Sequence, residues 1–421
     1  MHAIDRIVSE VDRAADEIVQ FTRELVRIPT INPPGDEYEP CARFLGAQLA
    51  RHHFDVEYIV ADSNEAHSER YPRVNVIGTR RGSRSGPGVH LNGHIDVVPP
   101  GLGWTVDPFE GIVRDGRIIG RGVCDMKAGL AAAVFAAEAL QRAGVALPGV
   151  LEISGTVDEE SGGFAGVAHL ARVGRIAKDR TPFVIIPEPL NVDRICIGHR
   201  GVYWFELTTK GQIAHGSTPF LGASAIEGMN EVLTALRHEL EPMLRARVTA
   251  MPIVPDAARH ATINVNGIEG GQRVDGIQTP CVADRCRAVF DRRFLFEETF
   301  DCAKDELEAL IAKALKTVAG VTYELRDLMV VEPVRTPDGS PVISALDGAI
   351  RRVLGSPARL VASPGTYDQK HIARIAGIPD CVAYGPGEIE LAHQPDESCA
   401  IADILNATKV IALATLELAS A

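Results

Sequence analysis

The carboxylates best placed to do chemistry follow an apolar strand. The stretch "GTVDEESGG", residues 155–163, puts Asp158, Glu159 and Glu160 at the end of the apolar run "VLEISGTV". Neighbouring side chains of a strand point to opposite faces of the sheet, so a purely solvated run of charges has no need to follow a buried strand. Three adjacent carboxylates therefore indicate that each has a different task.

A second candidate is the stretch "HLNGHIDVVPPG", where His94 and Asp96 lie two residues apart. On a strand this spacing puts both side chains on one face. The imidazole is then able to bind a metal ion while the aspartate holds its other ring nitrogen. A lone histidine in a strand is more often an ordinary core residue, so this pattern alone leaves both interpretations open.

Three further segments carry residues of the same ligand types. Asp125 in "GRGVCDMKAG" lies at the start of an expected helix, where capping that helix is the alternative role. Glu188 in "PEP" ends an apolar strand, at the edge where open α/β sheets bind ligands. His393 follows a glycine-rich loop in "GPGEIELAHQPDE". Together these histidines and carboxylates indicate a hydrolytic metal site, such as a zinc site.

Alternating helices and strands must position these residues. Residues 3–27 and about 38–53 have the apolar spacing of helices. Apolar strands then alternate with helices up to residue 198, which predicts an α/β layer with a largely parallel sheet. The expected strands are "DVEYIV", "VNVIGTRR", "GVHLNGHIDVV", "GVLEISGTV" and "PFVIIPEP", with helices at 127–143 and near 164–174.

The pattern changes between residues 199 and 330. Half-alternating strands, "GVYWFELTTKG", "TINVNGIEGG" and "CRAVFDRRF", are interleaved with helical patterns at 223–245 and 297–318. This combination predicts an α+β domain of antiparallel strands with two helices on one face.

The α/β pattern returns at residue 331. A helix is expected at 340–354, a strand and loop at "PDCVAYGPG", and a closing helix from about residue 398. Because the first and last parts resemble each other, we expect one catalytic domain made of 1–198 and 331–421, with 199–330 as an inserted domain.

Composition excludes several classes of function. The formal net charge of -13, without basic patches, argues against binding to nucleic acid or to anionic membranes. The charged N-terminal stretch has no export signal, and the apolar stretch "MKAGLAAAVFAAEAL" is too short and too charged for a membrane span. The 8 cysteines form no CxxC pair, which predicts reduced thiols and a cytoplasmic protein; Cys281 and Cys286 alone are a weak metal signal.

Six motifs resemble, in the same order, those of the M20 family of metallohydrolases, which includes acetylornithine deacetylase, succinyl-diaminopimelate desuccinylase, aminoacylase and glutamate carboxypeptidase. They are "GHIDVVPPG", "GRGVCDMKAG", "DEESGG", "PEP", "KGQIAHGSTP" and "AHQPDE", and they span nearly the whole chain. The resemblance implies an α/β, zinc-peptidase-like catalytic domain with a mostly parallel central sheet flanked by helices. The inserted domain is then an α+β, ferredoxin-like lid and dimerisation domain.

The resemblance also implies roles for the residues singled out above. Asp125 bridges two divalent metal ions, zinc or alternatively cobalt or manganese, with His94 and Glu188 completing one site and Glu160 and His393 the other. Two such ions lower the pKa of a shared water and polarise the scissile carbonyl. Glu159 is the implied general base and Asp96 the support of His94, whereas Asp158 is expected to be a hydrogen-bonding support beside the Gly162–Gly163 turn.

Other implied residues bind the substrate. His215 in "KGQIAHGSTP" would reach the active site of a partner subunit and stabilise the oxyanion, so a homodimer through the inserted domain is implied. Asn264 and Arg293 resemble positions that bind the substrate carboxylate, with Arg292 as the alternative to Arg293.

One loop departs from the family pattern. Many relatives carry a Gly-Gly-Thr-Ser-Asp-type loop over the substrate, and this chain has "SPGTYDQKH". Gly365 and Thr366 are expected to contact the substrate there, Pro364 and Tyr367 are the changed residues, and Asp368 keeps the acid of the motif. The change concerns the substrate pocket rather than the metal site.

These expectations favour a metal-dependent amidohydrolase that removes the acyl group of an N-acylated amino acid or a related small carboxylate. An exopeptidase using the same site is the first alternative, and hydrolysis of another C–N bond, such as deamination or deformylation, is the second. A catalytically dead binding protein is disfavoured because all five implied ligands and Glu159 are present.

Overall fold

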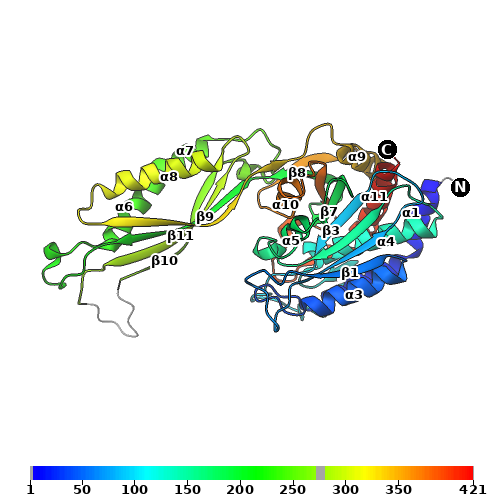
Figure 1. The fold of residues 1–421 in the computed structure, drawn as a ribbon, viewed down its shortest axis with the longest axis horizontal. Helices are drawn as coiled ribbons and strands as arrows, with labels where there is room; N and C mark the ends of the chain where they lie inside the picture. Colours follow the sequence, from blue (N-terminus) through cyan, green and yellow to red (C-terminus); the bar gives the residue numbers. More distant parts are fainter. Residues whose placement is uncertain (1–2, 272–279, 421) are drawn as a thin grey trace. The chain divides into compact units, whose positions relative to one another are not determined.

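The computed structural model shows a chain that forms two compact units (Figure 1). The described residues are 3–271 and 280–420. Unit 1 consists of the residues up to Gly198, Arg335–Val361 and the chain from Tyr367 onward; unit 2 consists of His199–Val334 and Ala362–Thr366. The expected insertion, residues 199–330, lies within unit 2.

A nine-stranded sheet forms the centre of unit 1. Its order is β1-β2-β6-β3-β7-β15-β8-β13, and β14 pairs with β8. The central strands β6, β3, β7 and β15 run parallel, whereas β1, β2 and β8 pair in antiparallel fashion. The predicted parallel sheet is confirmed for this centre. The bounds are β1 Asp55–Val60, β2 Val74–Arg80, β3 Val89–His94, β6 Leu151–Thr156, β7 Phe183–Pro189, β8 Arg194–His199, β13 Val334–Arg335, β14 Arg359–Ser363 and β15 Cys381–Gly385.

Helices cover both faces of this sheet, which explains why its strands read as continuous apolar runs. A side chain at Gly93 of β3 would meet Leu130 of α4 at 3.1 Å. The next residue back, Asn92, donates a hydrogen bond to Asp368 just before α10, so α4 and α10 lie on opposite faces. The helices are α1 Ala3–Arg13, α2 Ala15–Val26, α3 Tyr38–Arg51, α4 Ala128–Arg142, α5 Val167–Arg172, α9 Pro341–Leu354, α10 Gln369–Arg374 and α11 Ile401–Ala419.

The N-terminal segment differs from its prediction as one helix. It is divided into α1 and α2 at Ala14, whose ψ of 6° interrupts the helical geometry. None of the helices within residues 3–271 and 280–420 has the length and apolar character needed to cross a membrane.

One face of the two central strands is polar although it is buried. Its residues are His90, Asn92 and His94 of β3 and, opposite them, Glu152, Ser154 and Thr156 of β6. His90 Nε2 lies 2.7 Å from Ser154 Oγ, which donates to Asn92 Oδ1 at 2.7 Å. Asn92 Nδ2 in turn donates to Asp368 Oδ2 at 2.9 Å. These hydrogen bonds reduce the cost of burying the polar groups, and the network supports the strand ends at which His94 lies.

A small three-stranded sheet, which the sequence did not predict, joins two distant parts of unit 1. Its order is β16-β5-β4, with both pairings antiparallel. It brings the segment before Asp125 beside the segment after His393. The bounds are β4 Ile112–Arg114, β5 Arg117–Ile119 and β16 Ser398–Ala400.

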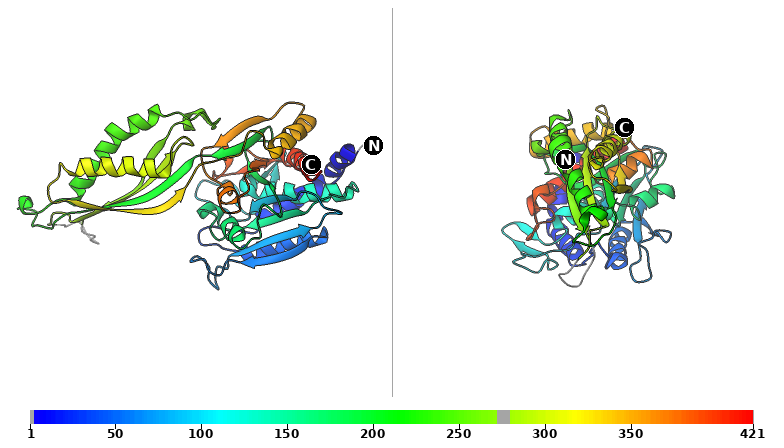
Figure 2. Two further views of the ribbon diagram at one scale, coloured as in Figure 1. Left: turned by 45° about the horizontal axis from the view of Figure 1, so that its top comes forward. Right: turned by 90° about the vertical axis from the view of Figure 1, so that its left-hand side faces the viewer.

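Unit 2 is a four-stranded antiparallel sheet with helices on one face (Figures 1 and 2). The strand order is β10-β11-β9-β12, and the chain order is βαββαβ, so the expected ferredoxin-like arrangement is confirmed. The predicted helix at 223–245 is α6 and α7, joined by the wider turn Leu236–Leu240. The bounds are β9 Gly201–Lys210, α6 Ala225–Ala235, α7 Glu241–Ala246, β10 Thr262–Gly270, β11 Arg285–Phe294, α8 Phe300–Leu315 and β12 Thr322–Val331.

Close packing of α4 on β7 gives a first prediction. A Cβ at Gly129 of α4 would lie 1.8 Å from the carbonyl oxygen of Pro187, so Gly129→Ala must push α4 away from the strand that carries Glu188. We expect urea denaturation to show a free energy of unfolding lowered by about 1–3 kcal/mol.

The matched control is Gly348→Ala in α9, where the nearest atom, Glu417 Oε2, would be 3.7 Å away. There the same substitution should be neutral or stabilise the protein by up to about 1 kcal/mol. Equal effects of the two substitutions would contradict the packing argument.

Candidate metal centre

Five side chains from distant parts of the sequence of unit 1 converge as two groups that share Asp125. The groups are His94, Asp125 and Glu188, and Asp125, Glu160 and His393, with the ligand atoms of each group within 4.8 Å of one another. His94 Nε2 lies 3.0 Å from Asp125 Oδ1 and 3.9 Å from Glu188 Oε1. His393 Nε2 lies 3.1 Å from Glu160 Oε1 and 3.4 Å from Asp125 Oδ2. Asp125 therefore presents one oxygen to each group.

Parallel strands explain this convergence. His94 ends β3, Glu160 follows β6, and Glu188 lies near the end of β7. The carboxyl ends of parallel strands meet at one edge of a sheet, where α/β folds bind ligands. Asp125 does not cap the helix that follows, because no side chain in the described part of the chain caps α4 and both Asp125 oxygens face histidines. The capping alternative is wrong.

The electrostatics of the cluster fit bound cations. Burial, followed by the charge of Asp125, raises the pKa of Glu160 to about 7 and raises the pKa of Glu188 well above its ordinary range. Hydrogen bonds that the His393 ring donates to the carboxylates of Asp125 and Glu160 raise the pKa of His393 to about 10. Crowded buried carboxylates without cations retain protons in this way, and divalent ions relieve the repulsion. The donor set of imidazoles and carboxylates suits such ions.

Asp96 has a wider contact set than predicted. Its carboxylate lies 3.5 Å from His94 Nδ1, but the closer partner of that nitrogen, at 3.0 Å, is the Asp96 backbone carbonyl. The carboxylate itself accepts the backbone N–H groups of Glu159 at 3.2 Å and Glu160 at 3.1 Å. Asn32 Nδ2 donates to it at 2.8 Å. Asp96 therefore fixes the backbone that carries Glu159 and Glu160.

Asp158 turns the chain out of β6. It has a φ of 61°, in the left-handed region, and its buried carboxylate accepts hydrogen bonds from Tyr38 at 2.8 Å and from Arg73 Nε at 3.0 Å. These bonds hold a backbone conformation that costs about 1–3 kcal/mol in a residue other than glycine. Hydrogen bonding is the role that the sequence predicted for this residue.

A buried ion pair that sequence reasoning missed supports the other half of the site. Glu397 accepts the backbone N–H groups of Cys124 at 2.8 Å and Asp125 at 3.1 Å, and it pairs with Arg121. Arg121 also donates to the carbonyl of His393 at 3.3 Å. Arg121 and Glu397 are almost fully buried. Their positions within "GRGVCDMKAG" and "AHQPDE" were the sequence feature from which a role at the site could have been predicted.

Glu159 has a partner that the sequence did not suggest. Its Oε1 atom accepts a hydrogen bond from Lys370 Nζ at 3.0 Å, and only 10% of the Glu159 side chain is exposed. Lys370 comes from the unusual segment "SPGTYDQKH". The Tyr367 side chain of that segment is buried, and its hydroxyl donates to Gln369 Oε1 at 2.7 Å.

The β10–β11 pair places the two candidate arginines of unit 2 on opposite faces. Arg293 pairs across the strands with Thr262, and Asp291 with Asn264, so Asn264 and Arg293 share one face. Arg292 points to the opposite face, is 2% exposed and pairs with Glu298 at 2.7 Å. The accessible guanidinium on the Asn264 face is therefore that of Arg293, which is held by Asp291 at 2.7 Å.

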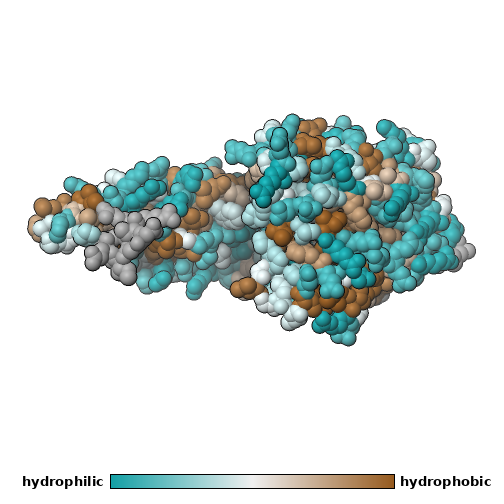
Figure 3. All heavy atoms as spheres, turned by 90° about the horizontal axis from the view of Figure 1, so that it is seen from below, coloured by the Kyte–Doolittle hydropathy of each residue, from teal (hydrophilic) through white to brown (hydrophobic). Residues whose placement is uncertain are grey.

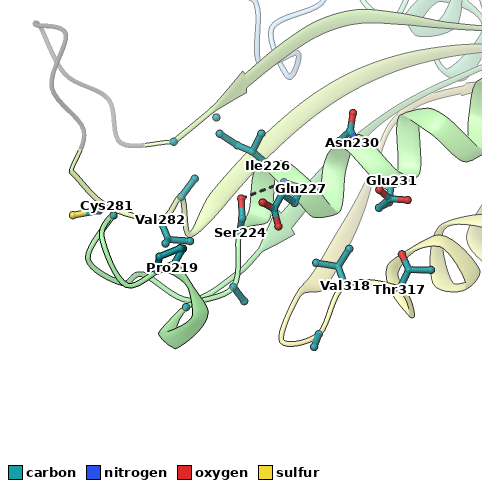
Figure 4. A pocket seen from close by; sticks show the side chains of 17 residues that line it. Pro219, Ser224, Ile226, Glu227, Asn230, Glu231, Cys281, Val282, Thr317 and Val318 are labelled. Atoms are coloured by element: carbon teal, nitrogen blue, oxygen red, sulfur yellow. Dashed lines mark hydrogen bonds between the residues drawn. The ribbon is translucent and has the colours of Figure 1, made fainter.

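His215 and the loop residues also belong to unit 2. His215 lies in an exposed turn, where its Nδ1 atom is 2.8 Å from Ser217 Oγ. The next residue, Gly216, lines a hollow of about 1000 Å³, which Figure 4 shows from close by. The metal-site residues do not line this hollow. Gly365 donates its backbone N–H to Ser363 Oγ at 3.1 Å, and Arg200 holds the carbonyl of neighbouring Pro364 at 3.1 Å. Thr366 ends the same segment.

Comparison with known proteins identifies the family. The sequence model of peptidase family M20/M25/M40 matches residues 90–417. The chain belongs to this family. Succinyl-diaminopimelate desuccinylase of Bordetella petrii is 30% identical over 93% of this chain and 95% of its own length. N-formyl-4-amino-5-aminomethyl-2-methylpyrimidine deformylase of Bacillus subtilis is 28% identical over 96% of this chain and 94% of its own.

Solved structures of other proteins share the fold. The dipeptidase Dug1p of Saccharomyces cerevisiae matches with a TM-score of 0.80 and 16% identity over 100% of both chains. The YXEP protein of Bacillus subtilis, described as a dinuclear metal binding peptidase of the M20 family, matches with a TM-score of 0.69 and 16% identity over 96% of this chain and 98% of its own. The predicted M20 membership and fold are confirmed, and the chain is a hydrolase of this family with a metal-binding cluster.

The protonation of the cluster predicts how metal binding depends on pH. Glu160 and His393 must lose their protons to act as ligands. Their pKa values of about 7 and about 10 mean that at pH 7 metal-free protein holds the His393 proton fully and the Glu160 proton about half of the time. Zn²⁺ binding followed by calorimetry in two buffers should therefore release about one proton or more per subunit at pH 7. The affinity should fall as the pH decreases from 8 to 6.

Glu160→Gln is the matched variant, because it removes one titrating ligand. It should weaken binding of one metal ion and flatten the pH dependence below pH 7. A Zn²⁺ affinity of the parent protein that does not change between pH 6 and pH 8 would contradict this account.

Proposed function

We propose that this M20 hydrolase removes the acyl group from an N-acylated amino acid or a related small carboxylate. The observation that carries the proposal is the pair of ligand groups joined by Asp125, with Glu159 beside them and outside both groups. Their donors suit two divalent metal ions, and we propose zinc, with cobalt and manganese as ions that the same set accepts. Glu159 is the proposed general base.

Two such ions, when bound, supply a water of lowered pKa and a polarised acyl carbonyl. Glu159 accepts a proton from the attacking water as the water oxygen bonds to the acyl carbon. The same carboxyl then gives that proton to the leaving nitrogen as the C–N bond breaks, which yields a carboxylic acid and an amine. Glu159 lies close enough to the cluster for its charge to contribute to the raised pKa of Glu188.

The substrate carboxylate is assigned to Arg293 and Asn264 of unit 2. A guanidinium binds a carboxylate through two parallel hydrogen bonds, and Arg293 already makes this contact with Asp291. A substrate carboxylate would compete for the same donors. Gly365 and Thr366 are proposed to contact the substrate from their loop, and His215 to donate to the developing oxyanion in a partner subunit.

The proposed homodimer uses the edge of unit 2. Within residues 3–271 and 280–420, strand β10 pairs only with β11 and so has an open edge, and Val265 and Ile268 are 41% and 57% exposed on it. Such an edge is able to pair with a second copy. Ile226 of α6 is 45% exposed and lines the hollow of Figure 4, where Ser224 caps α6 by accepting the N–H of Glu227. Hydrophobic residues also lie between hydrophilic ones on the surface of Figure 3.

A reducing compartment suits this chain. All 8 cysteines are free thiols, most of them buried, including Cys124 next to Asp125. We therefore propose a cytoplasmic enzyme with a small-molecule substrate.

Deformylation is the second candidate reaction. The deformylase of Bacillus subtilis covers this chain as fully as the desuccinylase of Bordetella petrii does, at 28% against 30% identity. A formamide requires the same attack on an acyl carbon. Assays with N-acetyl, N-succinyl and N-formyl amino acids and with dipeptides separate the proposed deacylase from the deformylase and the exopeptidase.

Replacing the general base is the direct test of the proposed function. Glu159→Gln should lower kcat by about 100-fold or more on the best substrate of that panel, because the proton acceptor is lost. Metal analysis should still find about two ions per subunit, since Glu159 belongs to neither ligand group.

Glu390→Gln, an exposed carboxylate near His393 in sequence, is the control and should retain the parent rate. Turnover by Glu159→Gln at the parent rate would show that Glu159 is not the base.

The dimer has its own test. Ile268→Asp together with Ile226→Asp should convert the protein to monomers in sedimentation velocity, because buried charge without a partner opposes association. Leu102→Asp in unit 1, where Leu102 is 94% exposed, is the control and should leave the dimer intact. A dimer of unchanged stability in the double variant would exclude the β10 edge and α6 as the interface.

A further inference from the structure

Lys370 is a buried cation at the side chain of Glu159. Its side chain is 3% exposed, and its Nζ atom donates to Glu159 Oε1 at 3.0 Å. A buried ammonium group costs free energy unless a carboxylate compensates it. The pair therefore fixes one oxygen of Glu159 and leaves the other, Oε2, to act.

The same helix holds the turn on which Glu159 lies. His371, next to Lys370 in α10, has its Nε2 atom 2.7 Å from the carbonyl oxygen of Gly162. Its ring also packs on Phe164, with centroids 5.4 Å apart. Lys370 thus contacts the side chain of Glu159, and the next residue of α10, His371, contacts the backbone of Gly162. The turn has little freedom to rotate away from α10.

A second carboxylate balances the charge of Lys370. Asp368 is 1% exposed, and its Oδ2 atom accepts a hydrogen bond from Asn92. Its Oδ1 atom is buried and accepts no hydrogen bond from the residues that the structure describes. That oxygen lies against the turn, 2.9 Å from where a Cβ of Gly163 would be.

Lys370 remains charged in this setting. Burial alone would lower the pKa of its ammonium group, but the charges of Glu159 and Asp368 outweigh burial and raise it. Asp368 therefore provides a negative charge beside Lys370 even while Glu159 carries a proton during turnover.

We propose that Lys370 is the positioning residue of the general base: it holds Oε1 of Glu159 so that Oε2 faces the attacking water, with Asp368 as its balancing charge. The inference rests on the proposed function, in which Glu159 moves the proton. In each turnover Oε2 takes the proton as the water O–H bond breaks and returns it to the leaving nitrogen. Lys370 itself neither gains nor loses a proton.

Another buried lysine of unit 1, Lys127, has a structural role and serves as a comparison. Lys127 donates to the backbone carbonyls of Leu25 at 3.0 Å and Ile28 at 2.7 Å, and so ties the end of α2 to α4. Lys370 is bonded instead to the side chain that moves protons. Its loss should therefore change turnover before it changes the fold.

The test compares Lys370→Met, Lys370→Gln and Lys370→Arg in the full-length metal-loaded enzyme, on the best substrate of the panel. Lys370→Met should lower kcat by about 100-fold with little change in KM. The substitution displaces the carboxylate of Glu159 and leaves the residues that bind the substrate in place. Lys370→Arg keeps the cation and should restore most of the loss, whereas Lys370→Gln should not. Lys304→Met, which removes a surface lysine paired with Asp327 at 2.7 Å, should keep the parent rate.

Readouts other than activity separate this role from damage to the metal site. Metal content and the visible spectrum of the Co²⁺-substituted protein should match the parent in Lys370→Met. If Lys370→Met loses metal, the comparison of Lys370→Gln with Lys370→Arg separates positioning of Glu159 from damage to the metal site. Both variants keep a hydrogen-bond donor, and only Lys370→Arg keeps the positive charge.

Three outcomes would overturn the proposal: a parent-like kcat in Lys370→Met, equal activities of the Gln and Arg variants, or an altered Co²⁺ spectrum in every variant. Glu159→Gln measured in parallel tests the proposed function separately. Its activity shows whether Glu159 is the base, whatever the Lys370 variants do.

Discussion

Two buried carboxylates hold the backbone of the metal centre, and the rest of the site depends on them. Asp96 accepts the N–H groups of Glu159 and Glu160, and Glu397 accepts those of Cys124 and Asp125. In each case one carboxylate binds two successive backbone amides and so fixes both position and rotation of the loop. Charge-assisted bonds of this kind are strong when buried. The carboxylate ligands can then face one another despite their repulsion, because their backbones have no easy way to separate.

The sheet topology brings the segments that Asp96 and Glu397 bind close to one another. Parallel β3, β6 and β7 deliver His94, Glu160 and Glu188 to one edge, and the small sheet of β16, β5 and β4 joins the segments of Asp125 and His393. Each of the two buried carboxylates has a partner of its own: Asn32 donates a hydrogen bond to Asp96, and Arg121 forms an ion pair with Glu397. A buried charge that lost such a partner would destabilise the fold by several kcal/mol, about 3–5.

The two faces of the unit 2 sheet give their side chains different environments. Even-numbered residues of β11 pack under the helices, and Arg292 among them is neutralised by Glu298. Odd-numbered residues, including Arg293, point to the opposite face. Figure 1 shows the helices of unit 2 on only one face of its sheet. Because a strand alternates its side chains, adjacent arginines have different environments. The sequence showed both arginines in the right strand, and strand pairing decided which one is accessible.

The sequence by itself determined the family, the alternation of strands and helices, and the residue types at the metal centre, because apolar periodicity and short motifs are local properties. It predicted Glu159, Glu160, Asp125, Glu188 and both histidines as one site through resemblance, and the structure brings the five ligand residues together. It did not reveal Lys370, Arg121 or Glu397 as their supports, since a charged residue in a sequence is usually solvated. Only tertiary structure buries those charges against partners as much as 276 residues away, and it is burial that gives them a role.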